Sequence, residues 1–469
     1  MLKYLNDLLQ PFRSCFSRQA TFEWFIILVV GFMLRSDHLG VTSVIRDLSL
    51  NGRCYETLIH FFRSSGWSTS SLRQRWLQVV RQHAPLLMIQ NRVVLVGDGM
   101  KQAKEGRRMP GVKKLHQESE NVAKGEYIFG HLFGAIGILV GDSRKWYGVQ
   151  TILGWKKSES EVETPSHVVQ MIEQGFEVAK GFGQALLLLD RYFLSVPALE
   201  RLNACHLAFE TRMHLVTKAK SKVVAYERPP AKKPGRGRPP KKGQAVKLKE
   251  LFATRAADFQ PTTLQLYGKE ETVQFLCLDL LWGQGLYQEL RFVLVVHEGC
   301  YSILVSTDLS LEAPDIIRLY SYRFKIESMF REMKQVIHAF GYRFWSKSMP
   351  KLNRFLRKEE AHPLEVVTNE QNRQRIQKTI QATEGFVMCQ CIAMGLLQLV
   401  ALQFSGRTSG LFFRYLRTPS HAVVSEASVA AYLRKSIFCL FAQNPHLSIT
   451  KIIKSKQENA DVERDSLVS

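Results

Sequence analysis

The sequence predicts an α/β fold with a mainly β insertion and helical regions at both ends. Two apolar runs, Val93–Gly97 and Ala185–Leu189, are typical of short buried strands, and an aspartate follows each of them directly. Glu161–Lys180, which lies between them, has helical periodicity. This order of strand, helix and strand favours a sheet whose strand ends meet at a common edge.

Residues 1–85 are predicted to form a helical, DNA-binding region. Gly40–Leu50 and Cys54–Phe62 are short amphipathic stretches on either side of an Asn51-Gly52 break. This pattern fits a helix-turn-helix, but it fits a plain helical bundle at least as well, and the sequence leaves both open.

Residues 86–212 are expected to form the first part of the α/β core. Tyr127–Val140 and Trp146–Leu153 resemble strands joined by a turn at Gly141-Asp142-Ser143. A basic stretch before them is expected to be irregular; it includes Lys101, Lys104, Arg107, Arg108, Lys113 and Lys114. These cations could follow a DNA backbone, or they could simply belong to a solvated loop.

Residues 213–307 are expected to be the β-rich insertion, beginning with a strand at Met213–Ala219. A basic loop at residues 227–244 interrupts it and is too rich in proline and glycine to pack a core. Within that loop, Arg236 and Arg238 resemble the core of an AT-hook, which lays arginine into a narrow minor groove. Nonspecific DNA contact is the simpler interpretation.

The remaining chain is predicted to be mainly helical. Residues 308–345 contain a long helix at Ala313–Phe340, residues 346–453 form a helical region, and residues 454–469 form a polar tail expected to be disordered. The apolar segment Gly385–Phe404 contains three glutamines, which favours a buried helix over a membrane span.

Charge indicates the class of partner. The formal net charge is +22 and the isoelectric point is near 9.7, so polyanions are expected to bind, nucleic acid above all. The eight cysteines include no CxxC pair and no zinc-type spacing with histidine, which predicts reduced thiols in the cytoplasm. With a DNA partner, association with the nucleoid is expected.

The strongest local pattern joins Tyr320, Arg323, Glu327 and Lys334, at spacings of three, four and seven residues. On one continuous helix these side chains, with Arg331, would share a face opposite an apolar one. Taken alone, the pattern could be an exposed helix stabilised by pairs such as Glu327 with Arg331.

The spacing Tyr-x2-Arg-x3-Glu-x6-Lys resembles the signature of bacterial insertion-sequence transposases of the DDE type, which pass through DNA hairpins. The resemblance covers most of the chain. It implies a ribonuclease-H-like catalytic core interrupted by the β insertion, with Asp98, Asp190 and Glu327 as catalytic and metal-binding carboxylates. It also implies phosphate contacts for Tyr320, Arg323 and Lys334. Arg331 and Lys101 are weaker candidates for DNA binding.

Three carboxylates from two strand ends and a helix can converge on one edge of a sheet. Mg²⁺ prefers such oxygen ligands, Mn²⁺ can substitute for it, and two ions can activate the attacking oxygen and stabilise the leaving one. The resemblance implies cut-and-paste transposition by a homodimer that binds double-stranded DNA, both transposon ends and target. The helical region 346–453 is then a candidate for the dimer contact. A catalytically inactive inhibitor of transposition, a two-metal nuclease without strand transfer and a structural nucleoid-type protein are the alternatives.

Overall fold

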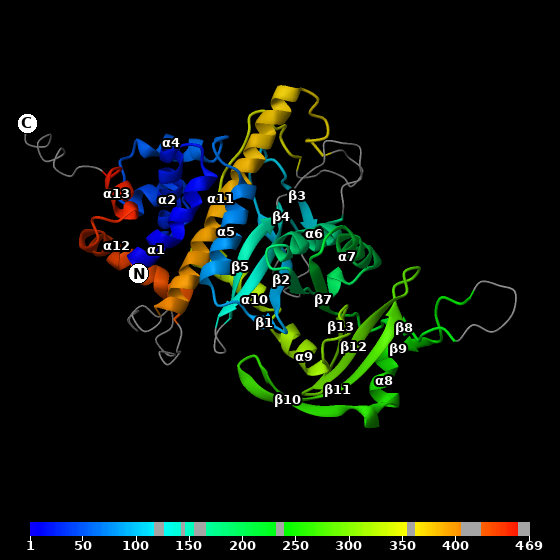
Figure 1. Cartoon of the computed structure of the whole chain (residues 1–469). Helices are drawn as coiled ribbons and strands as arrows, with labels where there is room; N and C mark the ends of the chain where they lie inside the picture. Colours follow the sequence, from blue (N-terminus) through cyan, green and yellow to red (C-terminus); the bar gives the residue numbers. More distant parts are fainter. Residues whose placement is uncertain are drawn as a thin grey trace, which may run out of the picture.

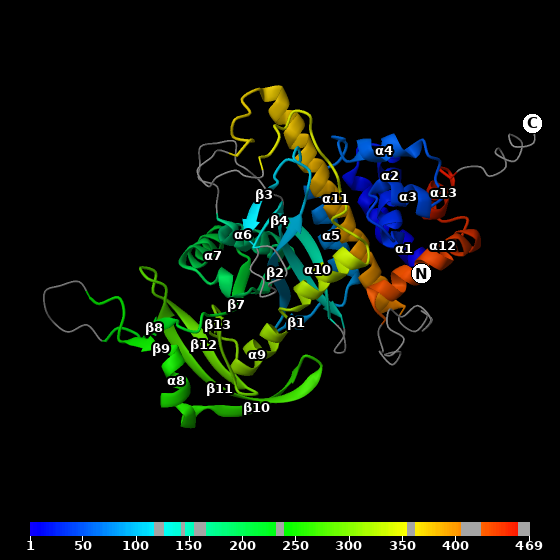
Figure 2. The same ribbon diagram turned by 180° about the vertical axis from the view of Figure 1, so that it is seen from behind.

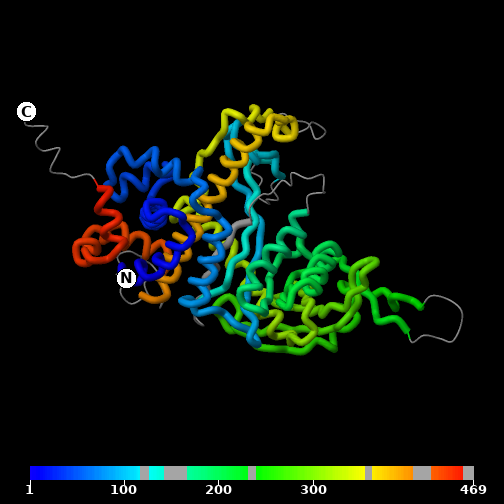
Figure 3. The backbone as a smooth tube through the Cα atoms, turned by 45° about the horizontal axis from the view of Figure 1, so that its top comes forward, coloured from blue at the N-terminus to red at the C-terminus, as the bar shows by residue number. Residues whose placement is uncertain are grey.

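The computed structural model describes residues 1–116, 126–141, 146–153, 166–230, 239–353, 362–404 and 424–457 (Figure 1). It is a mixed α/β structure in which one large sheet joins a helical body made from both ends of the chain. Figure 3 shows the first and last helices side by side at one end of the molecule, with the β-rich segment at the other. The predicted mixed α/β class, with helical regions at both ends of the chain, is confirmed.

The helical body combines segments that are far apart in sequence. Phe32 and Phe386 pack with ring centroids 4.9 Å apart, which fixes α2 against α11. The N-terminal helices are α1 (Leu2–Leu9), η1 (Gln10–Cys15), α2 (Gln19–Leu34), α3 (Val41–Asp47), α4 (Cys54–Phe61) and α5 (Thr69–His83), and the C-terminal ones are α11 (Glu370–Gln403), α12 (Glu426–Gln443) and α13 (Ser448–Lys454). The expected break near Asn51-Gly52 separates α3 from α4, and both pack on α2 as in a bundle.

Helix α11 contains the apolar segment that the sequence analysis assigned to a buried helix. Among the described residues it alone is long and apolar enough to cross a membrane, yet 94% of its most apolar window is buried inside the fold. The prediction of a buried helix is therefore confirmed. Gln390 and Gln398 lie within it almost without solvent contact, and Gln398 Nε2 donates a hydrogen bond to Glu426 Oε1 at 3.2 Å.

The first half of the sheet has the strand order β5–β4–β2–β6–β7. Strands β2, β4 and β5 are antiparallel neighbours, whereas β6 is parallel to β2 and β7 is parallel to β6. The strands are β1 (Met88–Ile89), β2 (Arg92–Ala103), β3 (Lys113–His116), β4 (Tyr127–Gly141), β5 (Trp146–Leu153), β6 (Gln184–Leu188) and β7 (Arg212–Lys218). The connections after β5 and β6 contain α6 (His167–Ala179), η2 (Arg191–Phe193) and α7 (Val196–Ala208).

The second half of the sheet is antiparallel and continues from the first without a gap. Strand β13 pairs with β7 through Val305 and Thr217, so the described strands form one 13-stranded sheet. Its elements are β8 (Val224–Tyr226), β9 (Ala245–Lys247), α8 (Leu248–Thr254), η3 (Ala256–Asp258), β10 (Gln260–Leu266), β11 (Lys269–Trp282), β12 (Gln288–His297) and β13 (Cys300–Ser306). The strand expected at Met213–Ala219 exists as β7, but it is also the parallel partner of β6, because the sequence of a strand does not identify its neighbours.

The single helix predicted for Ala313–Phe340 is wrong. The chain forms α9 (Ala313–Ser321) and α10 (Lys325–Gln335), separated by Tyr322–Phe324 (Figure 2). At the break, the Tyr322 and Arg323 amides bond to carbonyls three residues back, at 3.0 and 3.1 Å, which tightens the turn and redirects the axis. Apolar periodicity continues across this turn, so the sequence pattern did not reveal it.

The two faces of the core sheet carry different helices. A Cβ added at Gly97 of β2 would meet Met171 of α6, so this face of the strand packs under α6. Because successive strand residues point to opposite faces, Asp98 points to the other side. Helix α10 contacts β2 and β5. Asp98 and α10 therefore meet on the face that α6 does not cover.

Candidate active site

Asp98 and Asp190 are neighbours through the register of two parallel strands. Val96 of β2 is paired with Leu188 of β6, and each aspartate lies two residues further along its chain. Leu189 packs toward Gly97 on the α6 face, so Asp98 and Asp190 share the opposite face. Asp190 follows the end of β6, as predicted. Asp98 instead lies inside β2, which continues to Ala103 beside β4 and leaves β6 at this point.

Asp98 occupies a mostly buried position, and its side chain is 20% exposed. Its Oδ1 accepts a hydrogen bond from the Gly99 amide at 2.7 Å. Burial raises the pKa of Asp98 to about 6; Arg323 and the Gly99 amide oppose this rise, whereas the charges of Asp190 and Glu327 add to it. The three predicted carboxylates are thus close enough to act on one another.

Asp190 is held by contacts with two neighbouring elements. Its Oδ1 accepts the Tyr192 amide at 2.9 Å and so caps η2. Its backbone carbonyl accepts a hydrogen bond from Thr217 Oγ1 of β7 at 2.8 Å. These contacts fix Asp190 at the edge where β6 ends.

Glu327 lies in the first turn of α10 and is the most open of the three, with its side chain 54% exposed. The guanidinium of Arg323 forms an ion pair with Glu327 through Nη2 and with Asp98 through Nη1, at 3.4 Å from Asp98 Oδ2. Burial lowers the pKa of Arg323, but the neighbouring carboxylates outweigh burial and raise it overall. Arg323 is therefore a firmly charged cation between two of the carboxylates.

The helix break brings an aromatic cluster beside this group. Phe324 follows Arg323 directly, and its ring lies 5.6 Å from the ring of Tyr267, centroid to centroid. Tyr267 and Gly268 form the two-residue turn between β10 and β11, both with positive φ, which is the hairpin geometry that matches strand twist. The side chain of Tyr267 is 64% exposed at this tip. The sequence analysis missed both rings, although Tyr-Gly between two strand patterns marks such a turn.

Tyr320 lies in the last turn of α9, two residues before the break. Burial raises the pKa of Tyr320 to about 12, with smaller effects from Arg323, Asp190 and Tyr267. Tyr320 is therefore a neutral hydroxyl beside the carboxylates at ordinary pH, as a phosphate contact requires. Lys334 lies seven residues after Glu327 on α10, about 10 Å along the helix axis.

The other predicted DNA contacts are distributed differently. Arg331 is exposed on α10 and pairs with Glu332 at 3.4 Å rather than with Glu327. Lys101 does not lie in an irregular loop, as expected, but in β2, where its Nζ donates to the His116 carbonyl at 2.6 Å. Lys113 and Lys114 likewise belong to β3, because residues of this stretch complete the sheet against β4. Arg236 and Arg238 lie outside the described residues.

The donor set fits a hard divalent cation, since Asp98, Asp190 and Glu327 offer only carboxylate oxygens. Among the described residues, their oxygens are not gathered as tightly as the potential ligand atoms of a second group, Glu271, His297 and Glu298, which all lie within 4.8 Å of one another. That second group lies near the β12–β13 turn of the insertion and contains none of the predicted residues. In the first group, the guanidinium of Arg323 pairs with two of the three carboxylates, those of Asp98 and Glu327.

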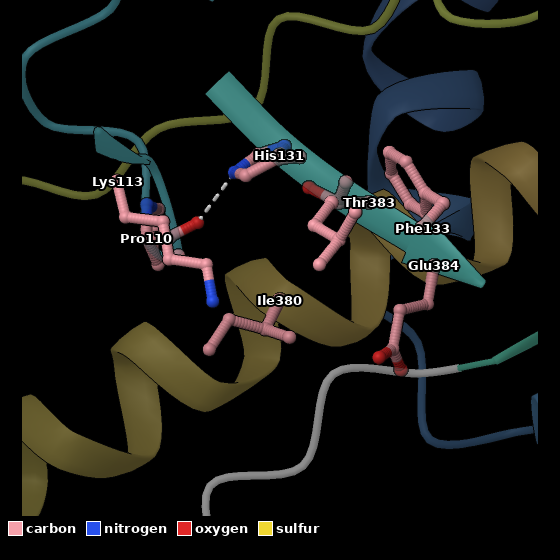
Figure 4. Close-up of a pocket in the computed structure, with 9 residues that line it drawn as sticks. Pro110, Lys113, His131, Phe133, Ile380, Thr383 and Glu384 are labelled. Carbon is pink, nitrogen blue, oxygen red and sulfur yellow. Dashed lines mark hydrogen bonds between the residues drawn. The ribbon is translucent and has the colours of Figure 1, made fainter. Parts of the chain in front are cut away.

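Two hollows occur near the far end of β2. A basic groove of about 860 Å³ is lined by His38, Ala103, Lys104, Glu105, Gly106, Arg107, Arg108, Met109, Gly341, Tyr342, Arg343, Trp345 and Lys351. A small cavity of about 30 Å³, drawn in Figure 4, lies against α11 and includes Lys113, His131 and Glu384. Its size suits a single water, so only the groove can accept a larger ligand.

The chain matches no protein-family model, no curated protein and no solved structure.

Proposed function

We propose that the protein is a DDE-type DNA transposase that performs cut-and-paste transposition of an insertion sequence. The observation that carries the proposal is the grouping of Asp98, Asp190 and Glu327 around Arg323. Arg323 pairs with both Asp98 and Glu327, and the charges of Asp190 and Glu327 raise the pKa of Asp98. They come from three separate segments of the chain. A purely structural role would require only one ion pair for Arg323, not a third carboxylate at the same strand edge.

The strand order supports a ribonuclease-H-like core for the proposed enzyme. Three antiparallel strands are followed by two parallel ones, with the first aspartate on the central strand and the second after its parallel neighbour. The β-rich segment enters after β7, and α10 brings the glutamate back to the same face. This topology supports the assignment of the catalytic carboxylates to Asp98, Asp190 and Glu327.

The proposed chemistry is phosphoryl transfer. Two Mg²⁺ ions, when bound by the three carboxylates, would activate the attacking water or 3′-hydroxyl and stabilise the leaving oxygen. Arg323 would grip a phosphate with its paired N–H groups, and Tyr320 would donate its hydroxyl proton in a hydrogen bond to a phosphate oxygen. Lys334 would neutralise a phosphate further along the strand. Nicking, hairpin formation and opening, and joining to target DNA would follow at this one site, with a homodimer holding paired ends.

The test uses a plasmid carrying the gene with its own flanking DNA, incubated with the purified protein and Mg²⁺. We expect excised element with hairpin ends and, with a second plasmid, joined products. Asp98→Asn, Asp190→Asn and Glu327→Gln should each abolish these products, whereas Glu177→Gln on α6, exposed and remote from the site, should not. Cleavage without joining would instead identify a nuclease, and end binding without cleavage an inactive inhibitor of transposition.

A further inference from the structure

The basic groove described above lies at the far end of the strand that carries Asp98. Five basic residues line it, namely Lys104, Arg107, Arg108, Arg343 and Lys351, and Glu105 is the one acidic residue among the described residues of its lining. Arg107, Arg343 and Lys351 are exposed and form no ion pair with another described residue. Trp345 is 48% exposed at the same place and adds an aromatic surface with an N–H donor.

The groove and the carboxylates are joined by two elements that run between them. Asp98 lies in β2, and Lys104 directly follows the last residue of that strand, Ala103. Their separation of six residues corresponds to about 20 Å of extended chain. Helix α10 starts near Glu327 and carries Lys334 about 10 Å further on. The chain that follows α10 meets the end of β2, where Lys104 Nζ donates to the Phe340 carbonyl at 2.6 Å. Basic residues therefore occur beside the carboxylates (Arg323), between the carboxylates and the groove (Lys334), and in the groove itself (Lys104).

The walls of the groove are tied together before any ligand binds. The Tyr342 hydroxyl lies 2.6 Å from His131 Nδ1 of β4, and Lys104 Nζ lies 3.6 Å from the centre of the Tyr342 ring. His131 is anchored in turn to the Pro110 carbonyl at 2.9 Å, the bond drawn in Figure 4. Arg108 spans the groove and donates to the Lys347 carbonyl at 2.7 Å. Because these contacts already hold the groove walls in place, ligand binding should lose little free energy to ordering them.

We propose that this groove binds the phosphate backbone of duplex DNA about six base pairs from the phosphate that reacts at the carboxylates. The distance of about 20 Å corresponds to that number of base pairs at about 3.4 Å each. Arginines and lysines along a groove suit sequence-independent contact with the phosphates of a duplex. This inference rests on the proposed function for its position relative to the cut, but the groove's affinity for DNA is measurable without cleavage.

The experiment compares two triple variants by fluorescence anisotropy with a labelled DNA duplex between 50 and 200 mM salt. Arg107→Gln/Arg343→Gln/Lys351→Gln removes three groove charges. The matched control, Lys3→Gln/Lys451→Gln/Lys454→Gln, removes three exposed charges from α1 and α13 in the helical body. Urea unfolding of both variants establishes that they fold as the wild type does.

We expect the groove variant to lose much of the salt dependence of binding. Each phosphate contact contributes about 0.9 to the slope of log affinity against log salt, so the wild type should weaken about 40-fold more than the groove variant over this range. Equal slopes for the groove variant and the wild type would overturn the proposal, as would a change confined to single-stranded DNA or an equal change in the control.

Hydroxyl-radical footprinting then tests the position. On the flanking DNA, the groove variant should lose protection about six base pairs from the cut while keeping protection at the cut itself. Loss at any other distance would overturn the proposed path. If the groove substitutions reduce the salt slope but the wild type never cuts DNA, the groove is a DNA surface and the proposed function is refuted. If the wild type cuts DNA but the groove substitutions change neither the salt slope nor the footprint, the proposed function stands and the groove proposal is refuted.

Discussion

Arg323 contacts Asp98 across the gap between α10 and β2, with Nη1 3.4 Å from Oδ2, while the same guanidinium pairs with Glu327. A single positive group thus partly neutralises two of the carboxylates proposed to bind metal. A divalent ion entering the site must compete with it. Under the proposed function, Arg323 would then become available to a phosphate, which would couple metal binding to the grip on DNA.

Replacing Arg323 by glutamine should separate metal affinity from catalysis. Removal of the competing cation should tighten Mn²⁺ binding several-fold, measured by calorimetry. Without Arg323 the carboxylates repel one another, and a bound ion relieves that repulsion. DNA cleavage should nevertheless fall by at least tenfold, since a charged phosphate contact is lost. Arg318→Gln, on α9 and paired with Asp315, is the control and should change neither property. If Arg323→Gln weakened both Mn²⁺ binding and DNA cleavage, Arg323 would not be competing with the metal ion for the carboxylates.

Replacing Asp98 by asparagine should stabilise the metal-free protein. The pKa of Asp98, raised to about 6, means that its buried charge opposes folding at neutral pH. We expect the free energy of unfolding in urea to rise by about 1 kcal/mol at pH 8, as for many residues kept for function rather than stability. Below about pH 3 the carboxyl is protonated in both folded and unfolded chains, so the gain should disappear there. A variant that is less stable at pH 8 than the wild type would refute this account.

The exposed ring of Tyr267 should matter for DNA with an unpaired nucleotide near the cut. Its position beside Phe324 suits stacking on a base, a contact worth about 1–3 kcal/mol. Tyr267→Ala should therefore weaken binding of such a DNA by roughly tenfold in anisotropy measurements. Tyr301→Ala is a matched control, because Tyr301 is also 64% exposed but packs on Phe252 elsewhere in the insertion. Equal effects of the two substitutions would exclude a specific stacking site.

Lys104 predicts a pH dependence of stability. Burial and the charge of Arg343 lower the pKa of Lys104 to about 7, despite two carbonyl acceptors and the Tyr342 ring, which favour its charged form. Between pH 7 and about 10.5 the unfolded chain holds a proton that the folded chain has released, so stability rises with pH. Relative to Lys104→Met, the wild type should gain roughly 1 kcal/mol of unfolding free energy per pH unit between pH 7 and 9. If the difference in unfolding free energy between wild type and Lys104→Met did not change between pH 7 and 9, Lys104 would stay charged in the folded protein.

The contact between Gly395 and Trp76 predicts a packing defect. A Cβ at Gly395 of α11 would lie 2.2 Å from Cζ2 of Trp76, whose side chain is fully buried and cannot move aside. Gly395→Ala should lower the free energy of unfolding by about 1–3 kcal/mol despite the better helix propensity of alanine. Gly52→Ala, with no atom within 4 Å of the new methyl, should be nearly neutral in the same urea titration.

The strands and the two aspartates could be predicted because both depend on local patterns. Short apolar runs mark buried strands, and an aspartate directly after such a run is expected at a strand end. This holds for Asp190 but not for Asp98, because β2 continues to Ala103. The pairing of β7 with β6 could not be predicted in this way, since pairing depends on partners distant in the chain. The sheet therefore turned out to be continuous where two separate parts were expected.

The position of Glu327 was predicted by a helical pattern that the structure only partly follows. Tyr320 and Arg323 precede the end of the break, and Glu327 and Lys334 follow it, so the four residues do not lie on one straight helix. Arg323 reaches Asp98 from the break itself. Sequence spacing identified the residues but not this geometry, because a tight turn with bonds three residues back preserves the apolar period. The groove was also missed, since its walls are distant in sequence.

The packing of α2 against α11 has a consequence for how the chain folds as it is made. Helix α2 is apolar on nearly every side, and its partner Phe386 is translated more than 300 residues after Phe32. At a translation rate of about 5–20 residues per second, the apolar surface of α2 stays exposed for on the order of 20–70 s before α11 is made. Nascent chains should therefore depend on chaperones during that interval, and slow translation should favour aggregation of the unfinished protein.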